Sequence, residues 1–326
     1  MTRSAAPVFK TSSRIGLYAM PLLLVLLAIA VSIWWLIASN MAAKEFDRIR
    51  SAEATRGRLW SCGEIAMGGF PFRIEAECRQ AKLMVLGDHP TTITANRYVV
   101  VSQIYQPSLL LLEIDAPLSV TGANGSATTV NWSLFRASVH LESSLEADRI
   151  SLEANDVIMK PSAQNEAAQF AHFEAHFRKR PVETGSSSDI EFSVDLSKAL
   201  LASLGGAAFD GHVSGRVDQG VVFLEQMGPP ALENWRKAEG KLVIDQLTMK
   251  RGDQHLSVSG VVTLDEQRRP SGKVDLAATG LRDLLKQTDM GQLADMMAGD
   301  VRLPLTMTKG RLLMGPLKLA DLQPLY

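Results

Sequence analysis

The chain has 326 residues, with 34 basic and 35 acidic side chains and a formal net charge of -1. This balance argues against a nucleic-acid-binding protein, because neutralising phosphates requires an excess of Lys and Arg. The hydrophobic fraction of 46% excludes a mostly disordered chain, and 2 cysteines are too few for a disulfide-dense scaffold or a four-cysteine zinc site.

An uncharged apolar run follows the short N-terminal tail and extends from Ile15 to Ala38. A helix over these 24 residues is long enough to cross a hydrocarbon core of about 30 Å. Trp34 and Trp35 lie near its end, as is typical of a membrane interface. A cleaved signal peptide would have a shorter apolar region and a small-x-small cleavage site, which Ser39-Asn40-Met41 does not provide. The sequence therefore predicts one uncleaved span, residues 15–38, in a bacterial inner membrane.

The charges that flank this span favour opposite orientations. The tail, residues 1–14, carries Arg3, Lys10 and Arg14, whereas the far flank has more Lys and Arg, diluted by Asp and Glu. Long domains are translocated largely regardless of flanking charge, and Arg14 abuts the span. We therefore expect a single-pass protein with a cytoplasmic N-terminus and a periplasmic main body.

Beyond the span, the sequence predicts a helical extension followed by strands. Residues 39–58 mix Met41, Phe46 and Ile49 with charged residues, and no Gly or Pro occurs before Gly57. From residue 59 onward, apolar and polar residues alternate in short runs rich in Val, Ile and Thr, which indicates half-buried strands. The expected strands are 73–78, 91–104, 129–140, 149–159, 190–196, 220–224, 241–249 and 255–264.

The expected fold class is mainly β, an extended curved antiparallel sheet or a sandwich with a few short helices after the transmembrane helix. One such helix is predicted over residues 281–297, where Leu and Met recur at roughly helical spacing. The Gly/Ser stretch 184–189 is either a domain linker or a long hairpin loop. It separates a β-rich N-terminal half, 59–183, from a β-rich C-terminal half, 190–326.

Two cysteines, Cys62 and Cys78, are about sixteen residues apart. If they face each other on adjacent strands, a disulfide would stabilise the fold by about 3 kcal/mol and would persist in an oxidising compartment. The alternatives are two buried free thiols or a catalytic thiol, and the latter needs a paired histidine that is not identifiable. We favour the disulfide.

The one metal-like cluster in the sequence is His172, Glu174 and His176. On a strand all three share one side, and two histidines with a carboxylate suit iron or zinc. However, a polar, solvated strand face needs no metal, and the spacing is not HExxH. No Gly-rich phosphate loop or G-x-S-x-G elbow is present. We therefore expect a non-enzymatic protein with no metal, no cofactor and no catalytic residues.

Several segments together resemble a known family. Cys62-Gly63, then Gly68-Gly69-Phe70-Pro71-Phe72-Arg73 and Cys78 resemble an uncharacterised (domain-of-unknown-function) family of single-span bacterial envelope proteins, as do residues 235–260, 310–317 and 324–326. The resemblance implies one membrane anchor and an exported β-rich body, with no established activity to transfer. The repeated strand-turn-strand pattern is more loosely similar to AsmA-like envelope proteins, which are thought to present long curved sheets to lipids.

The leading functional hypothesis is an envelope protein that binds or shuttles lipid or acyl chains. The runs Val99–Val101 and Leu109–Leu112 are apolar on both faces of a strand and must be covered by helix, sheet or ligand. Hiding each methylene of an acyl chain from water is worth about 0.8 kcal/mol. The alternative reading of these runs is a core closed by the protein's own second layer. The rival function is a structural or scaffolding component that pairs its sheet edges with other envelope proteins.

Overall fold

The computed structural model describes residues 15–326 except 88–89, 143–145, 163–167, 182–187, 202–205, 227 and 281–300. The described part is mainly antiparallel β with a long N-terminal helix, as the sequence predicts. The tail 1–14, the expected helix 281–297 and most of the Gly/Ser stretch lie outside the described residues.

Helix α1 (Ile15–Thr55) is continuous, so the predicted span and its extension form one helix. It is the helix of the described chain that is long and apolar enough to cross a membrane. Its second half contacts β1 and β3. The side that faces the sheet carries residues at helical spacing, with Ser39 buried and Trp35, Ala42, Phe46 and Arg50 partly buried.

The strands make up a single 18-stranded sheet. Their bounds are β1 (Arg58–Ser61), β2 (Glu64–Gly68), β3 (Arg73–Val85), β4 (Thr91–Gln103), β5 (Gln106–Ile114), β6 (Leu118–Thr121), β7 (Ala127–Asn131), β8 (Leu134–Leu141), β9 (Ala147–Pro161), β10 (Ala168–Lys179), β11 (Ile190–Leu201), β12 (Phe209–Val217), β13 (Leu242–Arg251), β14 (Gln254–Leu264), β15 (Pro270–Thr279), β16 (Val301–Thr308), β17 (Arg311–Met314) and β18 (Leu317–Asp321).

The sheet is an antiparallel meander, in which neighbours in sequence pair with one another from β8 through β18. In the first half, β5 and β6 both pair with β4, and β7 and β8 both pair with β9, so each couple acts as one interrupted strand. β10 and β11 lie on either side of the Gly/Ser stretch and pair directly. The two predicted halves therefore share one sheet.

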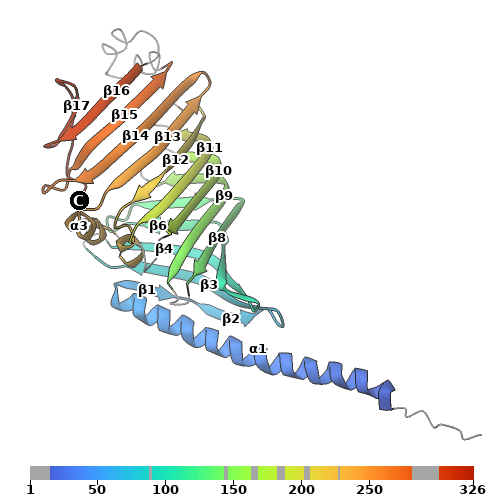
Figure 1. Cartoon of the computed structure of the whole chain (residues 1–326). Helices are drawn as coiled ribbons and strands as arrows, with labels where there is room; N and C mark the ends of the chain where they lie inside the picture. Colours follow the sequence, from blue (N-terminus) through green and yellow to red (C-terminus); the bar gives the residue numbers. More distant parts are fainter. Residues whose placement is uncertain are drawn as a thin grey trace, which may run out of the picture.

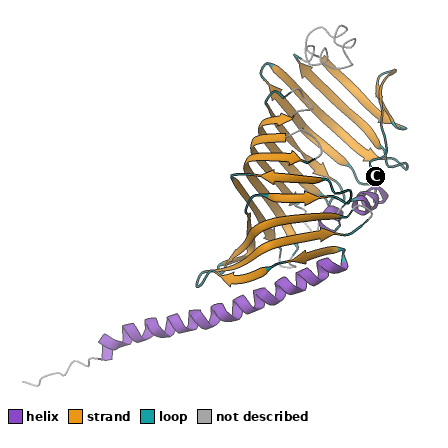
Figure 2. Cartoon of the chain, turned by 180° about the vertical axis from the view of Figure 1, so that it is seen from behind, coloured by secondary structure: helices purple, strands orange, loops and turns teal. Residues whose placement is uncertain are grey.

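The sheet curls, and it has no second layer of strands within the described chain. β4 and β6 lie behind β9–β11 in Figure 1, and the view from behind in Figure 2 shows the same curl, with α1 running beneath the β1–β2 edge. The described strands all belong to this one curled sheet, so the architecture is the predicted extended curved sheet and not a sandwich of two separate sheets.

A line of irregular residues, here called the crease, crosses the strands from β3 to β11. Gln80 in β3, Asp156 in β9 and Lys198 in β11 have positive φ angles of 54°, 51° and 50°. In register with them, the chain is interrupted between β5 and β6 and between β7 and β8. Trp132 bridges these two interruptions, because its Nε1 donates a hydrogen bond to the carbonyl of Ile114 at 2.9 Å. Such irregularities bend and twist strands, so the crease curves the sheet along the strand direction.

The alternation of apolar residues shifts by one position at the crease. Cys78 and Ala81 are 2% and 8% exposed although they are three residues apart, and Arg79 and Gln80 between them are exposed. Ala154 and Val157 flank Asp156 in β9 in the same way. In a regular strand, residues three apart point to opposite faces. The left-handed residue at the crease thus returns the apolar side chains to one face.

One expected strand is wrong. Residues 220–224 form a turn that leads into helix α2 (Val222–Glu225), which is followed by α3 (Pro229–Lys237). Phe223 packs against Trp235 of α3, with ring centroids 5.9 Å apart. The apolar residues of this segment therefore pack against a helix and not within a sheet. Trp235 also donates a hydrogen bond to the carbonyl of Asp218 at 2.8 Å.

The crease yields a prediction about backbone strain. Lys198→Val should lower the free energy of unfolding by about 1–2 kcal/mol, because a β-branched residue tolerates the left-handed conformation poorly. The free energy of unfolding of Lys198→Asn should stay close to that of the parent protein. Urea unfolding in detergent measures both effects, and Lys160→Val, at an exposed strand position without positive φ, is the matched control. Equal losses at both positions would contradict the prediction.

Candidate functional site

One face of the sheet carries an unbroken row of apolar residues, here called the central row. The strand register places its members directly opposite one another, so the row crosses the sheet perpendicular to the strands. At about 4.8 Å between neighbouring strands, it extends for roughly 58 Å. Its members, from β2 to β16, are Met67, Ala76, Val100, Leu112, Ala137, Leu152, Ala175, Val194, Val213, Leu247, Val258, Leu276 and Leu303.

Two further rows flank the central row on the same face, which we call the apolar face. From β5 onward they contain no charged or polar side chain, whereas in β4 the first row continues through Ser102, whose hydroxyl donates a hydrogen bond to the Pro107 carbonyl. One row consists of Leu110, Val139, Ile150, Phe177, Phe192, Gly215, Ile244, Gly260, Val274 and Leu305, and the other of Phe135, Ala154, Phe173, Leu196, Gly211, Met249, Leu256 and Ala278.

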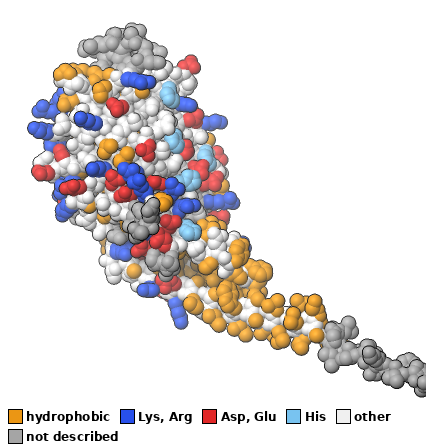
Figure 3. Space-filling view, in the orientation of Figure 1, with side chains coloured by type: hydrophobic (Ala, Val, Ile, Leu, Met, Phe, Trp, Pro, Cys, Tyr) orange, Lys and Arg blue, Asp and Glu red, His pale blue; other side chains and the backbone are white. Residues whose placement is uncertain are grey.

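The opposite face is polar and lies on the outside of the curl. Figure 3, in the orientation of Figure 1, shows Lys, Arg, Asp, Glu and His spread over this face of the body. Glu153, Glu174 and Asp195 lie directly opposite one another on β9, β10 and β11. Their like charges would repel, but histidines lie beside two of them. His176 Nε2 is 2.8 Å from Glu174, and His212 Nδ1 is 2.8 Å from Asp195.

Among the described residues, most side chains of the apolar face are only partly buried. Helix α1 packs at the first edge, where it contacts β1 and β3. Tyr98 of β4 lies on the apolar face opposite Cys78, near this edge. Burial raises the pKa of Tyr98, and nearby Arg50 of α1 opposes that shift. From β5 to β16 most side chains of the central row are only partly buried. This extent of partly exposed apolar surface is typical of an interaction site.

The structure places His172, Glu174 and His176 together on the polar face of β10. His172 Nδ1 lies 2.6 Å from Asn155 Oδ1, and His176 Nδ1 lies 2.9 Å from Ser151 Oγ. Both partners belong to β9, so neighbouring strands occupy these ring nitrogens. Among the described residues, no group of three His, Cys, Asp or Glu is arranged to hold a metal ion. The arrangement is a hydrogen-bonded polar surface.

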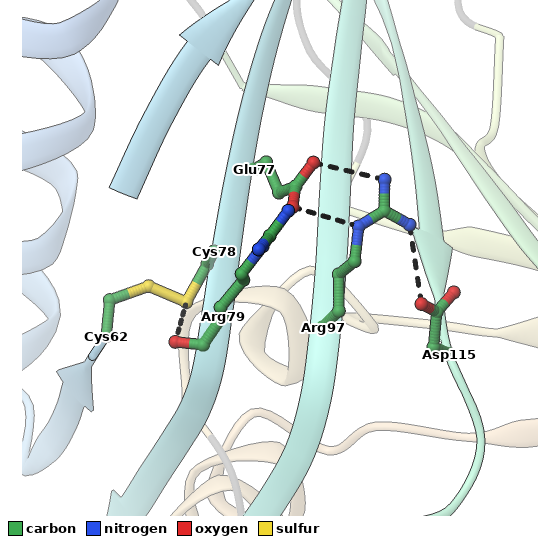
Figure 4. A network of polar contacts seen from close by, with 6 residues as sticks. All are labelled: Cys62, Glu77, Cys78, Arg79, Arg97 and Asp115. Atoms are coloured by element: carbon green, nitrogen blue, oxygen red, sulfur yellow. Dashed lines mark hydrogen bonds and ion pairs between the residues drawn. A yellow bond between two sulfur atoms is a disulfide. The ribbon is translucent and has the colours of Figure 1, made fainter. Parts of the chain in front are cut away.

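Cys62 and Cys78 form a disulfide, as the sequence predicts. Cys62 lies between β1 and β2, and Cys78 lies in β3, so the bond fastens the turn between β1 and β2 to the third strand. Figure 4 shows a charged network beside it, in which Glu77 lies between Arg79 and Arg97. The Glu77 carboxylate accepts hydrogen bonds from Arg97 at 3.2 Å and from Arg79 at 2.7 Å. These guanidinium groups lower the pKa of Glu77 to about 2.

The family segment Gly68–Arg73 forms the turn between β2 and β3 and contacts helix α1. Trp35 Nε1 donates a hydrogen bond to the carbonyl of Arg73 at 2.9 Å. The Trp35 and Phe70 rings meet edge to face, with centroids 5.6 Å apart. Gly69 has a φ of 93°, and a Cβ there would lie 2.6 Å from the Arg73 carbonyl oxygen, so the turn requires glycine.

The other family segments meet at the opposite end of the chain. The hydroxyl of Tyr326 donates a hydrogen bond to Glu233 of α3 at 2.9 Å, and Arg268 lies over the Tyr326 ring. A Cβ at Gly240 would lie 2.1 Å from the Trp235 ring. These residues fasten the C-terminus to α3.

The apolar face itself was not identified from the sequence, although a signal for it exists. Apolar residues occupy positions 74, 76 and 78 in β3 and then positions 81, 83 and 85. This shift predicts an irregularity that keeps one face apolar. Strand register was the missing information, since only pairing shows that separate alternating runs share one face.

Loss of the disulfide should destabilise the protein. Cys62→Ser with Cys78→Ser should lower the free energy of unfolding by about 3 kcal/mol. Urea unfolding under oxidising conditions measures the difference, and reduction of the parent protein should reproduce it. If thiol labelling of the unreduced parent protein modified both cysteines, the disulfide would be disproved.

The lowered pKa of Glu77 predicts a specific acid response. The folded state favours the ionised carboxylate, so Glu77 contributes to the free energy of unfolding. This contribution is complete above the ordinary pKa of 4.5 and disappears as the pH falls towards about 2. Glu77→Gln should therefore reduce the loss of stability between pH 4.5 and pH 2, measured by urea midpoints. Glu266→Gln, in an exposed turn, is the control and should leave the pH profile unchanged.

A comparison with known families identifies the chain. The family model described as an uncharacterized protein conserved in bacteria (DUF2125) matches residues 34–323. This range includes both cysteines and the Gly68–Arg73 turn. No curated protein and no solved structure matches the chain, so the looser resemblance to AsmA-like proteins stays a prediction. The chain belongs to the DUF2125 family of uncharacterised bacterial proteins.

Proposed function

We propose that this protein is a non-enzymatic, membrane-anchored envelope protein whose apolar face binds the acyl chains of lipids. The observation that carries the proposal is the central row, which crosses the sheet from β2 to β16 without a charged or polar side chain. A face of this kind offers acyl chains continuous contact without any cost of burying polar groups.

Energetics support an acyl chain as the occupant. Each methylene removed from water is worth about 0.8 kcal/mol, so an acyl chain of roughly fourteen carbons gains on the order of 10 kcal/mol from burial. The partly exposed side chains of the central row are buried at the same time, which adds to the favourable free energy. A sheet with one layer leaves the face accessible, whereas a sandwich would have filled it with its own side chains.

A periplasmic location of the body is part of the proposal. The disulfide between Cys62 and Cys78 supports it, because such bonds persist in oxidising compartments and are rare in the cytosol. Helix α1 supports attachment to the inner membrane through residues 15–38.

The two edges of the sheet favour lipid binding over scaffolding through strand pairing. At one edge, α1 packs beside β1 and β3. At the other edge, β18 is short and its pairing with β17 is interrupted by a register shift. Short and irregular edge strands discourage pairing with other chains.

The proposal predicts face-specific lipid contact. Val213 and Ser214 are adjacent in β12 and point to opposite faces. We expect p-benzoylphenylalanine incorporated at Val213 to form ultraviolet-induced adducts with phospholipid in cells, and the same residue at Ser214 to form several-fold fewer. Mass spectrometry of the detergent-purified full chain identifies the adducts.

This comparison requires that both variants fold. Formation of the Cys62–Cys78 disulfide, detected on non-reducing gels, reports on folding. Equal lipid adducts at the two positions, or none at Val213, would refute acyl-chain binding. A stoichiometric protein adduct at Val213 would favour the scaffolding function.

A further inference from the structure

Two strand-end turns lie side by side and present exposed aromatic residues. The β2–β3 turn contains Phe70 and Phe72, and the β4–β5 turn contains Tyr105. The backbone N–H of Ile104 donates a hydrogen bond to the carbonyl of Phe72 at 3.1 Å, which joins the two turns. Phe70, Phe72 and Tyr105 are 56%, 64% and 74% exposed. Such a concentration of exposed aromatic surface marks a contact site.

The membrane helix fixes the position of these turns. Trp35 makes both contacts, the hydrogen bond to the Arg73 carbonyl and the edge-to-face contact with Phe70. Along α1, the distance from Ile15 to Trp35 is about 30 Å, which equals the thickness of the hydrocarbon core. Trp35 therefore lies at the membrane interface on the side of the body, and the two turns lie at the same level.

The opposite end of β3 lies far from this level. The N–H of Leu86 donates a hydrogen bond to the Gly57 carbonyl at 2.8 Å, just beyond the end of α1. From Trp35 to Thr55, the last residue of α1, the helix rises by roughly 30 Å. Leu86 is itself 51% exposed, so it offers an apolar side chain of similar exposure well away from the bilayer.

We propose that Phe70, Phe72 and Tyr105, here called the aromatic foot, insert into the interface of the bilayer that holds α1. Aromatic rings favour this layer, where an apolar ring and a polar edge are both accommodated. Figure 3 shows hydrophobic side chains gathered where the body meets the helix. The foot adds a second attachment to the single anchor, so the body is fixed in orientation as well as in distance.

The aromatic foot also gives the apolar face a defined contact with the membrane. Ile74 follows Arg73 directly and is the first residue of β3 on the apolar face. In the strand register, Ile74 lies opposite Ser102 of β4, and Ser102 lies opposite Leu110 of β5. A lipid that leaves the bilayer beside the foot therefore meets the apolar face at β3–β5. The insertion of the foot does not itself depend on lipid binding by the apolar face.

The test uses the full chain in nanodiscs of phosphatidylethanolamine and phosphatidylglycerol. We place p-benzoylphenylalanine at Phe72, at Tyr105 or at Leu86 and measure phospholipid adducts after irradiation. We expect adducts at Phe72 and Tyr105 that exceed those at Leu86 several-fold. Adducts at Phe72 and Tyr105 no more frequent than at Leu86 would overturn the aromatic foot.

A second variant tests whether the foot acts as a unit. Phe70→Ser with Phe72→Ser should reduce the Tyr105 adduct several-fold, whereas Leu86→Ser should not change it. An unchanged Tyr105 adduct in the double variant would count against joint insertion, provided that the disulfide forms normally. Adducts at Phe72 and Tyr105 without any at Val213 would retain the foot and refute acyl-chain binding on the apolar face, so the two failures are distinguishable.

Discussion

The structure depends on one physical constraint, which is that a single-layer sheet has one apolar face and too little protein to cover it. In a sandwich, two sheets bury their apolar faces against each other. In the part of the chain that the structure describes, the central row continues over the strands and α1 packs at one edge. Because the sheet curls around its apolar face, the curl reduces the apolar area that is exposed to solvent. The remainder is the surface that the proposed function assigns to acyl chains.

The crease and helix α1 together determine the shape and the first edge of the apolar face. The crease bends the strands while the shift at Gln80, Asp156 and Lys198 keeps the apolar residues on the inner side. Helix α1 runs without interruption from its apolar first half, which is long enough to cross a membrane, to the first edge of the sheet. Its contact with the Gly68–Arg73 turn joins that edge to the middle of the helix. In the proposed function, these elements together hold the apolar face beside a bilayer.

Much of this architecture could be predicted from local sequence pattern. Strands such as 255–264 alternate strictly, because both faces of a single layer have a distinct environment, and the expected disulfide is present. The open sheet could not be distinguished from a sandwich, since both give the same alternation. The helix over Val222–Glu225 was missed because the apolar run Val221–Leu224 is too short to show a period. The contacts of His172 with Asn155 depend on register, which local pattern does not specify.

The meander has a consequence for how the protein is assembled. From β9 onward every strand pairs with the one that precedes it, so each new strand finds its partner already in place as the chain is synthesised from its N-terminus. Pairings between close neighbours have a low entropic cost of loop closure. The sheet is therefore suited to growing strand by strand, with a single unfinished edge that advances away from α1.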